Sequence, residues 1–249
     1  MKSLKRIVLD LLYRSPVFPH IFFFVNPFKT NELRAIRERL RLQRADVVLD
    51  IGCGYGLQTN ILGRAVERII GIDVDPDPVR RAQSEQHLVA GKSRSEFRVT
   101  SIEDAAFPAA SFDKIVSICV LEHIPDYLSV LRECHRVLKP DGRMVFSIDS
   151  LATIREPAIV ELHRTRYKVQ RYFRPAEIKA DFERVGFRDV QVEHLFSSPL
   201  AADLFVAGIR RDWKYRYLEA WWLGWKIRLA EARAPARGES IFLIVSCRK

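Results

Sequence analysis

Three glycines at alternate positions mark the place where this chain is best suited to hold a small ligand. Gly52, Gly54 and Gly56 follow an apolar run, Val47–Leu49, that ends in Asp50. An apolar run, a glycine turn and an amphipathic segment predict a buried strand leading into a helix. Glycine lets the backbone adopt positive φ and approach a ligand closely, and the N-terminus of the following helix favours an anionic group.

The spacing of these glycines differs from that of a dinucleotide-binding motif. The dinucleotide fingerprint needs its third glycine one place later, where this chain has Leu57. A second apolar strand, Arg68–Ile72, ends in Asp73, about 20 residues after Gly52, which is close to the interval at which nucleotide-binding folds place a ribose-binding acid. We therefore predict that Asp73 accepts hydrogen bonds from ribose hydroxyls, whereas Asp75 caps the next helix.

Three later phrases carry a resemblance to a known family. "SFDKIVS", "VLEHI" and "RVLKPDG" follow the glycine turn in order and lead into a strand over Arg143–Ile148. Together they cover roughly residues 46–150. The whole resembles class I S-adenosylmethionine (SAM) methyltransferases, and within them the ubiquinone- and menaquinone-biosynthesis group, methyltransferase type 11-like. The resemblance implies SAM as the cofactor and S-adenosyl-L-homocysteine as its product.

The resemblance also implies a role for each residue near the glycine turn. The glycines would meet the methionine part of SAM, and Asp50 would orient its amino group directly or through water. The carbonyl of Cys119, at the end of the fourth predicted strand, would lie near the same amine. The expected cofactor-binding residues are Asp50, Gly52, Gly54, Gly56, Asp73, Val74, Ser101, Ile102, Glu103 and Cys119.

The adenine contact departs from the family pattern. The family often has an Asp-Ala pair after the third strand, whose carboxylate meets the adenine amino group. Here the pair is Ser101-Ile102. Ser101, Glu103 or Asp104 would have to accept that hydrogen bond instead.

His123 is the candidate catalytic residue. It lies just past the fourth predicted strand, where ligands bind in open α/β sheets, and its pKa range suits general-base work on a hydroxyl or an acidic carbon. The alternative is that His123 caps a helix or bonds to Glu122 or the backbone. Methyl displacement needs no metal, and the four cysteines show no metal-ligand spacing, so we expect no metal site.

The alternation of strands and helices predicts an α/β fold. We expect a Rossmann-like, doubly wound sheet of seven strands, mostly parallel, and the resemblance implies an antiparallel last strand over 240–247 at the sheet edge. Residues 1–45 form a helical extension or lid, with a helix over Asn31–Leu42, and residues 46–249 form the SAM-binding domain. Insertions at 151–174 and 200–237, the second helical and before the last strand, would cover the substrate or contact a membrane.

Charge and aromatic residues gather at both ends of the chain. Residues 1–45 carry a net charge of +7 and residues 203–249 carry +5, whereas 46–202 carry −2. Met1–Phe28 begins with a basic amphipathic pattern and continues with phenylalanines, and all four tryptophans lie within 203–232. These segments suit an anionic membrane surface or simply cover the sheet. Stacking on nucleic acid is weaker because no nucleic-acid module is recognisable.

These observations predict SAM-dependent methyl transfer to a hydroxyl or carbon of a small, hydrophobic or lipid-like acceptor. The absence of an Asn/Asp-Pro-Pro-aromatic motif and of a Pro-Cys pair disfavours amide, adenine and cytosine acceptors. The alternatives are an RNA methyltransferase and a non-catalytic, membrane-associated SAM-binding protein. Without a convincing signal peptide or a spanning segment, we expect a cytoplasmic protein, peripheral at the inner face of a membrane.

Overall fold

The computed structural model describes residues 26–89, 94–234 and 238–249. The expected helix at the start of Met1–Phe28 lies outside this part of the chain. The elements, in chain order, are α2 (Lys29–Leu40), β1 (Val47–Ile51), α3 (Leu57–Gly63), β2 (Arg68–Asp73), α4 (Pro76–Val89), β3 (Ser95–Val99), β4 (Phe112–Ile118), η2 (Leu121–His123), α5 (Tyr127–Val137), β5 (Leu138–Asp149), α6 (Pro157–Tyr167), α7 (Pro175–Val185), β6 (Arg188–Leu195), α8 (Pro199–Arg210), α9 (Tyr217–Arg233) and β7 (Phe242–Arg248).

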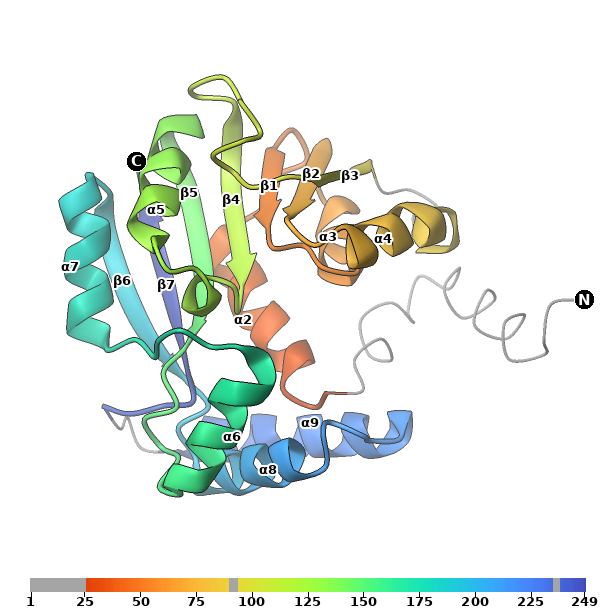
Figure 1. Cartoon of the computed structure of the whole chain (residues 1–249), viewed down its shortest axis with the longest axis vertical. Coiled ribbons are helices and arrows are strands. Elements are labelled where there is room, and N and C mark those ends of the chain that lie inside the picture. The colour runs from red at the N-terminus through yellow and green to blue at the C-terminus, as the bar shows by residue number, and fades with distance from the viewer. Residues whose placement is uncertain (1–25, 90–93, 235–237) are drawn as a thin grey trace, which may run out of the picture.

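The seven strands form one sheet in the order β3-β2-β1-β4-β5-β7-β6 (Figure 1). β1 pairs in parallel with β2 on one side and β4 on the other. β7 runs antiparallel to both β5 and β6. The predicted α/β fold, with a mostly parallel sheet and an antiparallel last strand, is therefore confirmed.

The expected position of the last strand is wrong. β7 lies between β5 and β6, so β6 rather than β7 forms that edge of the sheet. The cause is visible in the residues: Phe242–Cys247 is buried at every position, whereas Val190 is the one buried residue of β6. A continuous apolar run suits an interior strand covered on both faces.

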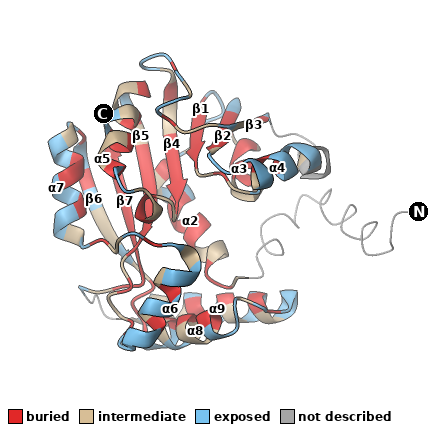
Figure 2. Ribbon diagram, in the orientation of Figure 1, coloured by how far each residue is buried: buried red, intermediate tan, exposed pale blue. Residues whose placement is uncertain are grey.

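Alternate residues of the central strands face two different helical layers. Leu49, Ile115 and Phe146 pack with α5 and α7 in one buried cluster. Their neighbours Val48 and Val116 pack with α2 and α3 in another. The helix expected over Asn31–Leu42 is thus α2, and its apolar stripe covers the second face of the sheet (Figure 2).

Helices α6, α8 and α9 lie together beyond the ends at which β1 and β4 finish (Figure 1). Their apolar side chains form a separate cluster centred on Phe28. The Phe28 ring makes edge contacts with Phe196, Phe205 and Trp213, at centroid distances of 4.9, 5.6 and 5.8 Å. These aromatic contacts therefore tie the start of α2 to α8 and to the segments on either side of it.

No described helix combines the length and the apolar character that crossing a bilayer requires. All four cysteines are unpaired, and Cys53, Cys134 and Cys247 are buried.

Candidate functional site

The turn after β1 has the backbone conformation that its glycines predict. Gly52, Gly54 and Gly56 have φ values of 73°, 50° and 71°. A Cβ on Gly52 would lie 2.2 Å from Cγ2 of Val120, whereas a Cβ on Gly54 would meet nothing within 4 Å. Gly52 therefore allows the turn to pack against the end of β4, and Gly54 faces open space where a ligand can approach the backbone.

Asp73, at the end of β2, lies beside this turn. Its Oδ2 accepts a hydrogen bond of 2.9 Å from the Gly54 N–H, and its Oδ1 accepts one of 3.0 Å from the Asp75 N–H. A carboxylate oxygen has a second lone pair, so both oxygens can still accept from a ligand. Asp75 in turn accepts from the Asp77 N–H at the start of α4, which confirms the predicted cap.

A cavity of about 360 Å³ opens beside Asp73 at the carboxyl ends of β1, β2 and β4. Eight of the sequence-predicted residues line it: Gly52, Asp73, Val74, Ser101, Ile102, Glu103, Cys119 and His123. Asp50, Gly54 and Gly56 do not line it. The structure therefore brings the ends of four strands and the predicted base, His123, to one pocket.

The walls of this cavity come from residues that the sequence analysis did not name. They are mostly β-branched and apolar: Ile51, Ile72, Thr100, Ile118, Val120, Ile124 and Val130. Most of them lie at strand ends, whereas Ile124 follows η2 and Val130 belongs to α5. Apolar residues of strands and helices carry no sequence signal that separates a pocket wall from the core. Val74 is 70% exposed, which is unusual for valine and leaves an apolar surface free to cover a flat ring.

Asp50 lies behind the cavity rather than in it. Its side chain is buried, and its Oδ2 accepts a 2.6 Å hydrogen bond from the Thr59 hydroxyl of α3. Burial, with a smaller contribution from Asp73, raises the pKa of Asp50 to about 7. Its contact with a ligand therefore remains a prediction that requires a water or a rearrangement of the turn.

The adenine side of the pocket carries several polar groups. The Ser101 hydroxyl donates to Oδ2 of Asp104 at 2.8 Å and accepts from the Asp104 N–H at 3.1 Å. Glu103 is exposed and lines the cavity. Asp104 does not line the cavity, so Glu103 supplies the carboxylate that is placed to accept from an amino group.

His123 ends the short helix η2 and lies half-buried at the cavity. Burial lowers the pKa of its imidazole below the ordinary value, although nearby backbone groups oppose that effect. The imidazole is therefore neutral near pH 7 and able to accept a proton. Its role as a base remains a prediction.

A buried polar group lies next to the pocket around Cys119. The Cys119 thiol donates to Oε1 of Glu32 at 3.0 Å, and the Lys29 ammonium lies 3.3 Å from its sulfur and 2.8 Å from Oε2 of Glu32. The Ser147 hydroxyl also donates to Glu32 at 2.5 Å. Helix α2 thus contacts the end of β4. This contact could not be predicted from the sequence, because Lys29 and Glu32 resemble an ordinary ion pair on a helix surface.

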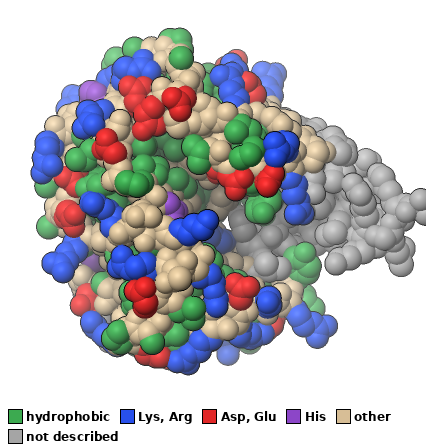
Figure 3. Space-filling model, viewed as in Figure 1, with side chains coloured by type: hydrophobic (Ala, Val, Ile, Leu, Met, Phe, Trp, Pro, Cys, Tyr) green, Lys and Arg blue, Asp and Glu red, His purple; other side chains and the backbone are tan. Residues whose placement is uncertain are grey.

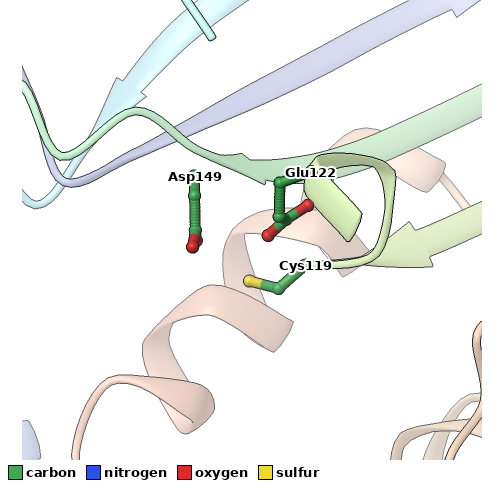
Figure 4. A group of neighbouring side chains, drawn as sticks. All are labelled: Cys119, Glu122 and Asp149. Atoms are coloured by element: carbon green, nitrogen blue, oxygen red, sulfur yellow. The ribbon is translucent and has the colours of Figure 1, made fainter. Parts of the chain in front are cut away.

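Cys119 also faces two acids on the other side, Glu122 and Asp149 (Figure 4). The Cys119 Sγ and one carboxylate oxygen from each acid lie within 4.8 Å of one another. Burial raises the pKa of the Cys119 thiol. Burial, together with the nearby Asp149, also raises the pKa of Glu122. Burial raises the pKa of Asp149 to about 7. A protonated thiol, a protonated carboxyl group and an adjacent ammonium disfavour a divalent cation here.

Comparisons with known proteins identify the family of the chain. A family model described as a methyltransferase domain matches residues 49–146. The ubiquinone biosynthesis O-methyltransferase of Xanthomonas axonopodis pv. citri (strain 306) is 30% identical over 179 residues, which cover 68% of this chain and 74% of that protein.

Two solved structures share the fold. The YcgJ protein of Bacillus subtilis has a TM-score of 0.62 at 23% identity, covering 88% of this chain and 98% of that chain. The phosphoethanolamine N-methyltransferase 2 of Haemonchus contortus, in complex with S-adenosyl-L-methionine, has a TM-score of 0.68 at 18% identity, covering 98% of this chain and 57% of that chain. The chain therefore belongs to the class I S-adenosylmethionine-dependent methyltransferases, with S-adenosylmethionine as its cofactor.

Proposed function

We propose that this enzyme methylates a hydroxyl group or carbon of a small, hydrophobic or lipid-like acceptor. The observation that carries the proposal is that His123 lines a mostly apolar cavity, and that Cys119 of the same cavity also packs against the cluster centred on Phe28. The name of the relative from Xanthomonas, a ubiquinone biosynthesis O-methyltransferase, supports an oxygen acceptor on an apolar molecule.

The residues of the pocket fit the cofactor that the family uses. SAM supplies a methyl group on a positively charged sulfur. We propose that Asp73 binds the ribose, that Val74 and Ile102 cover the adenine, and that Glu103 or Ser101 accepts from the adenine amino group. Gly52, Gly54 and Gly56 bring the backbone to the methionine part, and the Cys119 carbonyl and Asp50 attract its amino group.

His123 would remove the proton from the acceptor hydroxyl. A lowered pKa keeps the imidazole unprotonated at neutral pH, so it is ready to accept that proton as the oxygen attacks. The remaining acceleration would come from orienting the acceptor in the cavity that His123 lines.

We further propose that the enzyme works in the cytoplasm, peripheral at the inner face of a membrane. The exposed apolar residues Leu218, Trp221, Trp222 and Trp225 are 72%, 45%, 47% and 45% accessible and share helix α9. Lys and Arg side chains surround them, and Figure 3 shows cationic side chains over the region of α8 and α9. Indole rings beside cations are typical of membrane interfaces.

Transfer of a labelled methyl group from SAM into fractionated cell extract tests the acceptor class. With the whole chain, we expect label in an apolar small-molecule or lipid fraction. With Asp73→Asn, the amount of transferred label should fall by about tenfold or more, because cofactor binding weakens. Asp77→Asn is the matched control, since Asp77 is exposed and its carboxylate pairs with Arg80 of the same helix.

Each other outcome contradicts the proposal in a specific way. Label in RNA, with binding that weakens steeply with salt, would assign a nucleic-acid methyltransferase instead. SAM binding without label in any fraction would assign a non-catalytic SAM-binding protein. Label on a nitrogen of a small molecule would keep the enzyme class and reject the hydroxyl or carbon acceptor.

A further inference from the structure

A second cavity lies on the far side of α2 from the Lys29–Glu32 contact. It encloses about 350 Å³ between α2, α3 and α9, and its lining includes Arg34, Arg37, Arg228, Trp221 and Trp225. None of its lining residues is acidic. The cavity that is lined by the cofactor-binding residues shares no residue with it.

The walls of this cavity are held in place by close contacts between α2 and α9. The Asn31 side chain donates a 2.8 Å hydrogen bond to the carbonyl of Gly224. A Cβ on Gly224 would lie 2.9 Å from the Pro27 carbonyl oxygen, so only glycine lets the two helices approach this closely. The cavity is therefore a built feature of the helix pair.

The three arginines bring positive charge that the described residues do not neutralise by ion pairing. Within the described residues, no acidic side chain forms a salt bridge with Arg34, Arg37 or Arg228. Burial lowers the pKa of Arg34, and repulsion from the Arg228 guanidinium lowers it as well. The opposing effect of Glu38 is smaller. An anion bound between these guanidinium groups would remove that repulsion.

Exposed apolar surface borders the same cavity. Trp221 and Trp225 line it and are each 45% exposed, and Trp225 stacks on Trp222 with a centroid distance of 5.0 Å. Leu218, one turn earlier in α9, is 72% exposed. A ligand that matches both features is an amphiphile, with an anionic group in the cavity and apolar chains against the indole rings.

We propose that this cavity binds the phosphate of an anionic lipid headgroup, through Arg34, Arg37 and Arg228. Guanidinium groups are suited to phosphate because their planar donors bind two oxygens at once. The first 25 residues of the chain do not complement the positive charge of this cavity, since they carry four Lys or Arg and one Asp. The inference rests on the membrane contact proposed above and names the site that would recognise the headgroup.

Co-sedimentation with vesicles tests the site. The probes are phosphatidylcholine vesicles with and without phosphatidylglycerol, and the variant is the double substitution Arg34→Ala and Arg37→Ala in the whole chain. The matched control is Arg132→Ala with Arg174→Ala, because both arginines are exposed, belong to α5 and the start of α7, and change the net charge equally. Circular dichroism establishes that each variant is folded.

We expect the wild type and the control to bind the phosphatidylglycerol vesicles, and the Arg34/Arg37 variant to bind roughly tenfold or more weakly. Tryptophan emission should shift to shorter wavelength only where binding occurs. Equal binding by both double variants would overturn the cavity assignment while leaving a membrane contact. Failure of the wild type to bind would overturn the membrane contact itself, while methyl transfer could still be detected.

Inorganic phosphate separates a lipid headgroup from a free anion. If phosphate alone raises the melting temperature of the wild type but not of the Arg34/Arg37 variant, and vesicles do not bind, the cavity holds a free phosphate and the lipid assignment is wrong. If added phosphate merely competes with vesicle binding, the headgroup assignment is supported. Dimerisation that depends on Arg34 and Arg37 would instead assign the face to a second copy of the chain.

Discussion

The N–H of Gly54 donates a 2.9 Å hydrogen bond to Oδ2 of Asp73. One residue belongs to the turn after β1 and the other ends β2, and the two strands are parallel neighbours in the sheet. The acid proposed to bind the ribose therefore also holds the glycine turn in place. Loss of its charge should disturb both halves of the cofactor site together.

Asp73→Asn should weaken SAM binding by roughly tenfold to a hundredfold, because hydrogen bonds to a charged group contribute about 1.5–3 kcal/mol. Isothermal titration calorimetry with SAM and S-adenosyl-L-homocysteine measures the loss. Asp77→Asn should bind as the wild type does. Unchanged affinity in Asp73→Asn would remove this acid from the cofactor site.

Gly52→Ala and Gly54→Ala should differ in stability although both glycines have positive φ. A methyl group on Gly52 would overlap Val120, whereas one on Gly54 would enter open space. We expect Gly52→Ala to lower the free energy of unfolding by about 2–4 kcal/mol and Gly54→Ala by about 1 kcal/mol. Urea unfolding compares them, and a similar loss in both variants would contradict the packing explanation.

His123→Gln should reduce methyl transfer by roughly 10²–10⁴-fold while leaving SAM affinity near that of the wild type. In the wild type, the rate should fall on the acid side as pH drops through a pKa below the ordinary histidine value, because the imidazole becomes protonated. The acid limb should vanish in the variant. A retained limb, or a rate within a few-fold of the wild type, would leave His123 with a structural role.

Asp149→Asn should change how stability depends on pH. The pKa of Asp149 is raised by burial from 3.8 to about 7 in the folded chain. Its contribution is therefore fully present below the unfolded pKa and is lost as pH rises through about 7, by about 1.4 kcal/mol per pH unit. Asparagine should remove this part of the decline, as thermal unfolding over a pH series would measure.

Asp113→Asn is the matched comparison because its sign is opposite. Despite partial burial, the Lys139 ammonium, 2.8 Å away, holds the pKa of Asp113 below its ordinary value. Its contribution is present above the unfolded pKa and is lost as pH falls. Substitution should therefore alter the acid side alone, and identical pH profiles for the two variants would refute both assignments.

Residue type and spacing indicated some of the residues that line the cavity at the strand ends. Glycines with a needed positive φ and acids at strand ends are marked by residue type, and Gly52 and Asp73 do line one cavity, whereas their contacts with SAM stay predictions. Asp50 is predicted to orient the amino group of SAM directly or through water, and the structure places its buried side chain behind the pocket, hydrogen-bonded to Thr59. A single strand's pattern does not say which of its two faces meets a cavity.

The remaining features depend on contacts between distant residues. Lys29 and Glu32 lie more than 80 positions before Cys119, and nothing in their own segment distinguishes them from a solvent-exposed pair. The place of β7 inside the sheet was predicted wrongly because the resemblance was followed in preference to the unbroken apolar run Ile241–Val245. That run shows that local hydrophobicity had already indicated an interior strand.

The insertion of β7 between β5 and β6 has a consequence for biosynthesis. Of the seven strands, β7 leaves the ribosome last, yet it supplies all the backbone pairing that joins β6 to the rest of the sheet. Until residues 242–248 emerge, the edges of β5 and β6 that pair with β7 have no partner. The nascent chain therefore exposes unpaired strand edges, which can be bound by chaperones or can aggregate.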